Sequence, residues 1–392
     1  MLFLNYNYAN VLEDEIKIEG KIRKYYIDSA EVSKSLFERI AKKMKMNKAV
    51  VLTSDVFGHV TLNMWEAMRN AKLSGRFGGD ENVNALYERI KELTGKEAAV
   101  LVPSGTMANL VATMTHTNKG DQVILEQESH IVWSEEWGLS YVANVFPKLI
   151  SGNKGIVSPE SVSEAIEDCR FNHKPKTALL VLENTSMFAG GTIYTPDLTT
   201  EICKVAHERG VAVHLDGARL FNAAVALNIK AEKLVKNVDS VFVSLNKGLS
   251  APEGALLCGT KKFIDKAKIN LKRLGGNSMH KGGIVAAAGL VALSDKNIAR
   301  LAEDNRRAKI FSKAVKLIEG AEIDFSTVQS NIVLVDISSS GMDADSVLQS
   351  LAEHNINGFK KNKKIIRFTF HNGISDDDTM MAVDALKEVL QR

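Results

Sequence analysis

The sequence predicts an α/β fold in which a large domain with a mostly parallel sheet precedes a smaller α+β domain. Two observations lead to this prediction. From about Val50 onward, short apolar runs alternate with helical patterns, which is typical of parallel strands joined by helices. The chain of 392 residues is also too long for one ordinary small domain. We therefore expect an N-terminal extension at 1–48, a large domain at 49–280 and a small C-terminal domain at 281–392.

Six apolar runs predict the strands of the large sheet. Each run has the length of a buried strand and falls far short of a membrane span. The runs are Ala98–Pro103, Gln122–Glu126, Thr177–Glu183, Val211–Asp216, Ser240–Leu245 and Gly254–Cys258.

Capping residues mark the starts of two connecting helices. Ser158 can accept a hydrogen bond from the free amides of a helix that begins with Pro159, and Thr195 can do the same ahead of Pro196. An earlier amphipathic helix is expected at Ala30–Met44, where apolar residues recur at four-residue spacing. After about residue 282 the pattern predicts a long helical stretch, strands at Asn331–Asp336 and Ile365–Phe370, and a final helix from Asp376.

The overall composition excludes several classes of protein. Lys and Arg number 50 and Asp and Glu number 47, with both signs interspersed, so no nucleic-acid surface is indicated. The three cysteines lie far apart, which argues against a disulfide framework or a zinc site and favours a reducing, cytoplasmic location. No apolar run reaches the roughly 18 residues of a membrane span, and Met1–Tyr8 lacks the basic start of a signal peptide. We expect neither nucleic acid nor a membrane as a partner, and no metal.

Small and polar residues follow two of the predicted strands, at the ends where open α/β sheets bind ligands. Ser104, Gly105 and Thr106 lead from the first strand into a helix, so free backbone amides and a hydroxyl could bind a phosphate. An ordinary strand-to-helix turn is the alternative, since no Walker motif is present. His130 follows the second strand, where a structural role is the alternative to a functional one.

Asp216 and Lys247 stand at the ends of two later strands. Asp216 could cap a helix, or it could pair with a heterocyclic nitrogen. Lysine shifts its pKa readily when buried, and the neutral amine is what a Schiff base requires. A phosphate site, a His, an Asp and a Lys in this order match the phosphate, ring face, pyridine nitrogen and aldehyde of pyridoxal phosphate (PLP). The sequence therefore predicts a PLP enzyme.

Four segments resemble the threonine aldolase/β-eliminating lyase family. They read Pro-Ser-Gly-Thr-Met-Ala-Asn at 103–109, Glu-Asn-Thr at 183–185, His-Leu-Asp-Gly-Ala-Arg-Leu-Phe-Asn-Ala at 214–223 and Lys-Gly-Leu-Ser-Ala-Pro at 247–252. The similarity extends from about Leu52 to the C-terminus. It implies PLP fold type I, the aspartate aminotransferase-like fold, and a homodimer or homotetramer with active sites at the subunit interface.

The resemblance also implies how the cofactor would be held. Lys247 would carry PLP as a Schiff base, Asp216 would hold the pyridine nitrogen protonated, and His130 would stack on the ring. These three would be the catalytic residues. Arg219 would join them in the cofactor site, and the phosphate would be bound by Ser104, Gly105 and Thr106.

For the substrate, the resemblance implies a β-hydroxy-α-amino acid, threonine or a relative, cleaved between Cα and Cβ to glycine and an aldehyde. Ser54, Arg219 and Arg367 would hold its carboxylate, since the arginine fork matches a carboxylate bidentately. Ser186, with His130, would serve the β-hydroxyl.

The sequence departs from the family pattern in three places. Ser186-Met187 stands where the family has His-Asn, and that His is a candidate for binding or deprotonating the β-hydroxyl. The segment 75–80 lacks the tyrosine of the family loop, and 275–281 differs from a family run ending in Met-Arg-Gln. Alternatives are β-elimination, transaldol transfer or amino transfer on another amino acid, or PLP binding without turnover.

Overall fold

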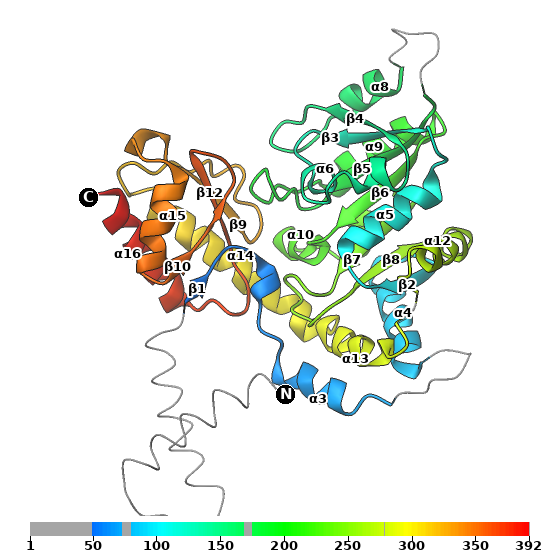
Figure 1. Ribbon diagram of the computed structural model, residues 1–392, viewed down its shortest axis with the longest axis horizontal. Coiled ribbons are helices and arrows are strands. Elements are labelled where there is room, and N and C mark those ends of the chain that lie inside the picture. Colours follow the sequence, from blue (N-terminus) through cyan, green and yellow to red (C-terminus); the bar gives the residue numbers. More distant parts are fainter. Residues whose placement is uncertain (1–48, 73–79, 168–174, 278, 392) are drawn as a thin grey trace, which may run out of the picture. The chain divides into compact units, whose positions relative to one another are not determined.

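The computed structural model describes residues 49–72, 80–167, 175–277 and 279–391 of the chain (Figure 1). The helix expected at Ala30–Met44, the loop at 75–79, Ser278 and Cys169 lie outside the described residues.

The central sheet has seven strands in the order β2-β8-β7-β6-β5-β3-β4. Only β8 runs antiparallel to its neighbours, so the predicted mostly parallel sheet is confirmed. All six predicted strands form, each within one or two residues of the predicted bounds, and β4 is an additional edge strand. The bounds are β2 Ala98–Val102, β3 Gln122–Glu126, β4 Phe146–Ile150, β5 Thr177–Glu183, β6 Ala212–Gly217, β7 Ser240–Ser244 and β8 Ala255–Gly259.

Helices cover both faces of this sheet, which explains why the runs are apolar throughout (Figure 1). Leu180 and Leu182 of β5 pack with α8 (Pro159–Glu167) and α9 (Pro196–His207) in one core. Leu179 and Val181, which point the opposite way, pack in another. The other described helices between residues 49 and 292 are η1 Asp55–Phe57, α3 Leu62–Arg69, α4 Glu81–Thr94, α5 Gly105–His116, α6 His130–Trp133, α7 Gly138–Tyr141, α10 Leu220–Ala226, α11 Ala231–Val235, α12 Lys261–Arg273 and α13 Gly282–Ala292.

The predicted helix starts are confirmed by their caps. Ser158 Oγ accepts a hydrogen bond from the Ser161 amide at 3.1 Å, and Thr195 Oγ1 accepts one from the Leu198 amide at 3.4 Å. The final helix begins at Asp376 as predicted, where Ser375 forms a capping box with the third helical residue.

The C-terminal region builds a second, smaller sheet with its own core. Strands β11, β12 and β9 are antiparallel, and β1 pairs in parallel with β10. Val50 and Leu52 therefore pack with the C-terminal core, while the domain boundaries themselves stay a prediction. The elements are β1 Val50–Val51, α14 Asp295–Val315, β9 Ile332–Asp336, η2 Ser338–Ser340, α15 Ala344–Glu353, β10 Ile356–Asn357, β11 Phe359–Lys360, β12 Ile365–Thr369 and α16 Asp376–Leu390.

Helix α14 takes part in both cores. Its Leu301 packs beneath the large sheet, whereas Phe311 contacts the rings of Phe368 and Phe370 at centroid distances of 5.0 and 5.4 Å. One continuous helix therefore links the two sheets.

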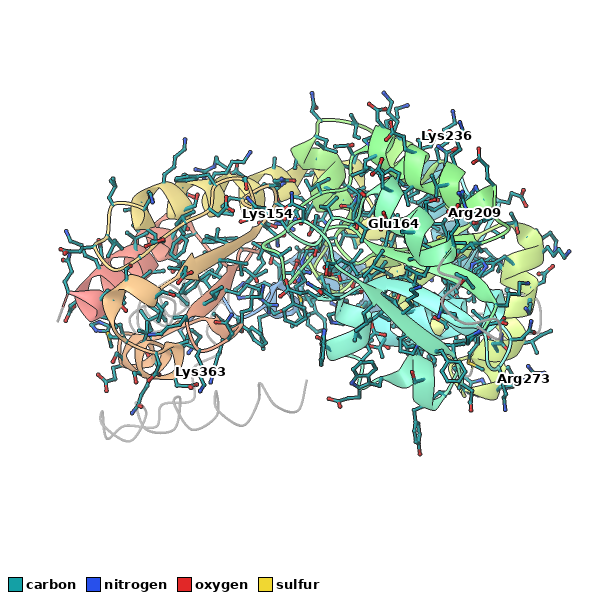
Figure 2. The ribbon with its side chains drawn as sticks, turned by 90° about the horizontal axis from the view of Figure 1, so that it is seen from above. Lys154, Glu164, Arg209, Lys236, Arg273 and Lys363 are labelled. Atoms are coloured by element: carbon teal, nitrogen blue, oxygen red, sulfur yellow. The ribbon has the colours of Figure 1, made fainter. Side chains whose placement is uncertain are left out.

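Charged side chains of both signs lie on the outside. The labelled residues of Figure 2, such as Lys154, Glu164 and Arg209, are all exposed. None of the described helices combines the length and apolar character of a membrane span.

Candidate active site

The topology brings the predicted site residues to one edge of the large sheet. Strands β2, β3, β5, β6 and β7 run in the same direction, so their carboxyl ends meet at that edge. Ser104 follows β2, and His130 follows β3. Asp216 is the last but one residue of β6, and Lys247 follows β7. Ligands bind at such edges in open α/β sheets.

Lys247 provides a primary amine at this edge of the sheet. It is partly buried, and within the described part of the chain its Nζ has no hydrogen-bond partner. Burial and the neighbouring positive charge of Arg219 lower the pKa of Lys247, while Asp216 opposes this shift. A larger neutral fraction makes the amine a better nucleophile.

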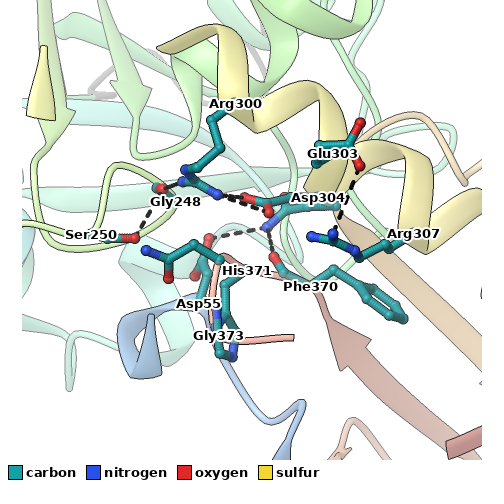
Figure 3. A network of polar contacts seen from close by, with 12 residues as sticks. Asp55, Gly248, Ser250, Arg300, Glu303, Asp304, Arg307, Phe370, His371 and Gly373 are labelled. Atoms are coloured by element: carbon teal, nitrogen blue, oxygen red, sulfur yellow. Dashed lines mark hydrogen bonds and ion pairs between the residues drawn. The ribbon is translucent and has the colours of Figure 1, made fainter. Parts of the chain in front are cut away.

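The turn that contains Lys247 is hydrogen-bonded to helix α14 (Figure 3). The Ser250 amide donates to the Lys247 carbonyl at 2.7 Å, and Arg300 Nη2 donates to the Gly248 carbonyl. Arg300 Nη1 also donates to both carboxylate oxygens of Asp304 at 3.0 Å. A Cβ at Gly248 would lie 2.7 Å from Asn222 Oδ1, so a larger residue there would have to displace the buried Asn222 side chain. These contacts fix the backbone beside the lysine.

Replacing Arg300 with alanine is expected to lower the free energy of unfolding by about 3–5 kcal/mol at pH 8, because it leaves Asp304 buried without its partner. Burial raises the pKa of Asp304 to about 6, so protonation at pH 5 should reduce the loss. Urea unfolding at both pH values measures it. Arg306→Ala, which removes exposed ion pairs on the same helix, should have a much smaller effect. Equal losses would contradict this role of Arg300.

Asp216 is a buried carboxylate with room for one more partner. Its Oδ2 accepts from Asn109 Nδ2 at 2.9 Å, and its Oδ1 accepts from the Ala218 amide at 3.0 Å. Each carboxylate oxygen can accept more than one hydrogen bond. The geometry therefore suits pairing with a protonated heterocyclic nitrogen.

Glu135 lies beside His130 at this edge of the sheet. It was not predicted from the sequence as a site residue. His130 Nδ1 lies 3.1 Å from Glu135 Oε1, and the His130 amide donates to Glu183 Oε2 at 2.8 Å. Burial, with a contribution from Lys247, lowers the pKa of His130 to about 4, so the ring is neutral at pH 7. The available signal was spacing: Glu135 stands five residues after His130, in the turn that follows α6.

His130, Glu135 and Asp216 present ligand atoms within 4.8 Å of one another, close enough for one metal ion. However, Asn109 Nδ2 already donates to an oxygen of each carboxylate. We therefore interpret the group as a hydrogen-bonded cluster.

Glu135 should make the apoprotein sensitive to rising pH. Burial and repulsion by Asp216 raise the pKa of Glu135 from 4.5 to about 8. The folded protein therefore holds a proton that the unfolded chain releases above pH 4.5, and this stabilisation is lost as the pH rises to about 8. Between pH 6 and 8, wild type should lose about 1.4 kcal/mol per pH unit relative to Glu135→Gln.

Urea unfolding of both apoproteins at pH 6, 7 and 8 checks this expectation. The exposed control Glu164→Gln should run parallel to wild type. A Glu135→Gln profile that is also parallel would mean that Glu135 is ionised in the folded protein.

Arg219 is engaged by Asp55, a partner 164 residues away in the chain. Its Nε and Nη2 donate to the two Asp55 oxygens at 2.8 and 2.7 Å, and both side chains are buried. Burial alone would raise the pKa of Asp55, but Arg219 overrides this and lowers it to about 2. The role of Arg219 in holding PLP or substrate stays a prediction.

Arg367 has donors to spare. Its Nη2 donates to the Thr53 carbonyl at 2.9 Å, and its guanidinium lies 4.2 Å from the centre of the Phe359 ring. Its Nε and Nη1 are buried without a hydrogen-bond partner. Burial, followed by repulsion from Arg219, lowers the pKa of Arg367 to about 10. An anionic ligand would satisfy these donors, since a buried unpaired charge is costly.

The predicted phosphate segment lies at the start of α5. Ser104 Oγ accepts from the Met107 amide at 3.2 Å, and Thr106 is exposed. A Cβ at Gly105 would lie 2.9 Å from the Phe242 ring, so glycine is required there. The first amides of a helix attract anions, and this helix spans 12 residues. Ser54 caps η1 by accepting from the Val56 amide at 3.4 Å.

Ser186 is packed against a neighbouring loop. Its amide donates to the Thr192 carbonyl at 3.0 Å, and its side chain is buried. A Cβ at Gly155 would collide with Ser186 Oγ. The Ser186 hydroxyl therefore lies against this loop, and a larger side chain in the same rotamer would press on it.

Comparisons with known proteins fit this geometry. The chain matches the family described as Beta-eliminating lyase over residues 52–338. It is 36% identical over 348 residues to low-specificity L-threonine aldolase 1 of Arabidopsis thaliana, covering 88% of this chain and 97% of the relative. Threonine aldolase of Leishmania major superposes with a TM-score of 0.75 at 18% identity, covering 87% of this chain and 99% of the other.

Aspartate aminotransferase of Rhizobium meliloti superposes with a TM-score of 0.67 at 14% identity, covering 95% of this chain and all of the other, 100%. At such low identities the two structural likenesses show the fold alone. The predicted aspartate aminotransferase-like fold, PLP fold type I, is confirmed.

Proposed function

The chain belongs to the β-eliminating lyase family, and we propose that it is a PLP-dependent lyase acting on a β-hydroxy-α-amino acid, threonine or a relative. It would cleave the Cα–Cβ bond and release glycine and an aldehyde. The observation that carries this proposal is the placement of Lys247 and Asp216 at one sheet edge, with a lysine amine that has no hydrogen-bond partner among the described residues.

The residues at this edge fit PLP. Lys247 would take the aldehyde, Asp216 the pyridine nitrogen and His130 the ring face. The phosphate would lie at the start of α5, bound by Ser104, Gly105 and Thr106. PLP, when bound, supplies a conjugated ring that accepts the electron pair released at the substrate Cα.

The chain itself would position the substrate and move its protons. The unpaired donors of Arg367 would bind the carboxylate and so set which Cα bond breaks, with Ser54 and Arg219 as the other predicted contacts. Glu135 Oε1 accepts a hydrogen bond from Asn109. The same oxygen can accept a second one from His130 Nδ1–H. His130 Nε2 then keeps a lone pair that can accept the β-hydroxyl proton.

Incubating purified holoprotein with L-threonine and L-allo-threonine tests the proposal. We expect glycine and acetaldehyde in equal amounts. Ammonia with a 2-oxo acid would show β-elimination, and loss of PLP absorbance with amino transfer would show a transaminase. Unchanged amino acids across a panel of β-hydroxy amino acids would indicate PLP binding without turnover.

Ser186 decides how far the reaction resembles that of the relatives. We expect Ser186→Ala to lower kcat/KM on threonine by about 10²-fold if the hydroxyl serves the substrate β-hydroxyl, the lower end of general acid–base assistance. Ser186→His should perform no better, because an imidazole in place of the Ser186 hydroxyl would press against the loop at Gly155. Steady-state kinetics with PLP loading matched by absorbance measures both. Ser186→Ala activity equal to wild type would remove Ser186 from the substrate site.

We also propose a homodimer or homotetramer with active sites at the subunit interface. Exposed apolar side chains of η1 and α3 support this: Val56, Phe57, Leu62 and Trp65 are 46%, 56%, 79% and 55% exposed. Sedimentation of the holoprotein would test it. The predicted cytoplasmic location rests on cysteine usage and stays a prediction.

A further inference from the structure

A chain of buried and half-buried hydrogen bonds runs from the end of helix α5, along strands β7 and β6, to Asp216. His116 Nε2 lies 2.7 Å from Ser240 Oγ, and Ser240 Oγ lies 2.8 Å from His214 Nδ1. His214 Nε2 lies 3.2 Å from Asn109 Oδ1. Asn109 Nδ2 then reaches Asp216 Oδ2 at 2.9 Å and Glu135 Oε1 at 2.8 Å. None of these polar atoms belongs to the residues assigned above to the substrate.

The carboxylate end determines the direction of every bond in this chain. Asp216 Oδ2 and Glu135 Oε1 both face the same Asn109 group. The Asp216 carboxylate can only accept, so that group must be the NH₂, which also donates to the Glu135 oxygen. Asn109 Oδ1 therefore faces His214, and His214 Nε2 must carry a hydrogen and donate it. His214 Nδ1 is then the acceptor, unless the ring is an imidazolium.

The imidazolium is disfavoured by its surroundings. His214 is fully buried, and burial, followed by repulsion from His116, lowers the pKa of His214 to about 3, although a hydrogen bond with the Ser240 backbone acts in the opposite direction. Burial likewise lowers the pKa of His116 to about 4. With both rings neutral, Ser240 Oγ–H donates to His214 Nδ1, and His116 Nε2–H donates to Ser240 Oγ.

We propose that His116, Ser240 and His214 form a positioning relay that keeps the amide NH₂ of Asn109 turned toward Asp216 and Glu135. Without the His214 donor, Asn109 Oδ1 would be buried without a partner, and the amide would be held by its two acceptors alone. The relay would thus hold Asp216 in one orientation at the cofactor edge. Its relevance to PLP rests on the proposed function, but its hydrogen-bond direction does not.

The tautomers of the two histidines test the relay in the apoprotein. ¹⁵N-labelled histidine side chains, assigned with His214→Gln and His116→Gln spectra, should show His214 and His116 as neutral Nε2–H tautomers at pH 7. An Nδ1–H tautomer or an imidazolium at His214 would overturn the proposed direction. This measurement involves no cofactor and is unaffected if the proposed function is wrong.

A matched pair of substitutions tests the consequence for the cofactor. His214→Leu removes the donor to Asn109, whereas His214→Gln can place an amide N–H near the lost Nε2. We expect His214→Leu to raise the dissociation constant for PLP about tenfold, the effect of one lost hydrogen bond to a charged network. His214→Gln should restore most of the lost affinity. In kinetics, His214→Leu should lower kcat and leave KM for threonine nearly unchanged.

The control is Thr115→Ala on α5, the helix of Asn109 and His116. It removes a buried hydroxyl that donates to the Val111 carbonyl and accepts from Asn270, outside the relay. It should bind PLP as wild type does. Wild-type PLP affinity in His214→Leu, or an equal loss in Thr115→Ala, would overturn the positioning role. Wild type that binds no PLP at all would refute the proposed function, while the tautomers would still decide the relay.

Discussion

Replacing Lys247 with alanine is expected to abolish covalent PLP attachment and lower turnover by at least roughly 10²–10⁴-fold, the range for a lost proton-transfer group. Lys247 has no hydrogen-bond partner among the described residues, so its removal breaks no structural contact of that kind. The fold should therefore survive. Single-turnover assays and the absorbance of reconstituted protein measure the two effects separately.

An exposed lysine provides the control for this substitution. Lys363→Ala should keep both the absorbance and the turnover of wild type. A Lys247→Ala protein that still forms a borohydride-stable PLP adduct and turns over normally would move the site to another lysine.

Replacing Asp216 with asparagine is expected to lower turnover by about 10²–10³-fold or more while PLP still binds. A carboxylate stabilises the protonated pyridine nitrogen, and a neutral amide offers no such charge. Circular dichroism should show the wild-type fold, and kcat should carry most of the loss. The pH dependence of the cofactor absorbance should shift with it.

A carboxylate at the opposite end of the same strands is the matched control. Asp239 accepts hydrogen bonds from His207 and from the Val213 amide, away from the carboxyl ends of β6 and β7. Asp239→Asn should change stability and leave kcat near wild type. Near-normal turnover in Asp216→Asn would show that Asp216 only orders the turn through the Ala218 amide.

The parts of the fold that could be predicted are those in which one local pattern decides the outcome. Strands β5 to β8 are buried on both faces, so apolar residues fill most of their positions and mark them in the sequence. Because these strands are mostly parallel, the residues after them necessarily meet at one edge. That is why Lys247, Asp216 and His130 could be selected from the sequence without any knowledge of their contacts.

The parts that could not be predicted depend on contacts between distant segments. Strand β4 lies at an edge with mostly half-exposed side chains, so no buried run marks it. Asp55 forms an ion pair with Arg219, which lies 164 residues away in the chain. Strand β1 pairs with β10 through two residues on each side. Neither leaves a periodic signal in the sequence. Asn109 ends the motif at 103–109, but its bridge between Asp216 and Glu135 depends on where helix α5 lies in the fold.

The most direct test of the central claim is to locate the cofactor on the chain. Holoprotein treated with borohydride, digested and analysed by mass spectrometry should carry the reduced PLP adduct on the peptide containing Lys247 and on no other lysine. An adduct elsewhere, or no adduct with PLP in excess, would contradict the assignment of this sheet edge as the active site.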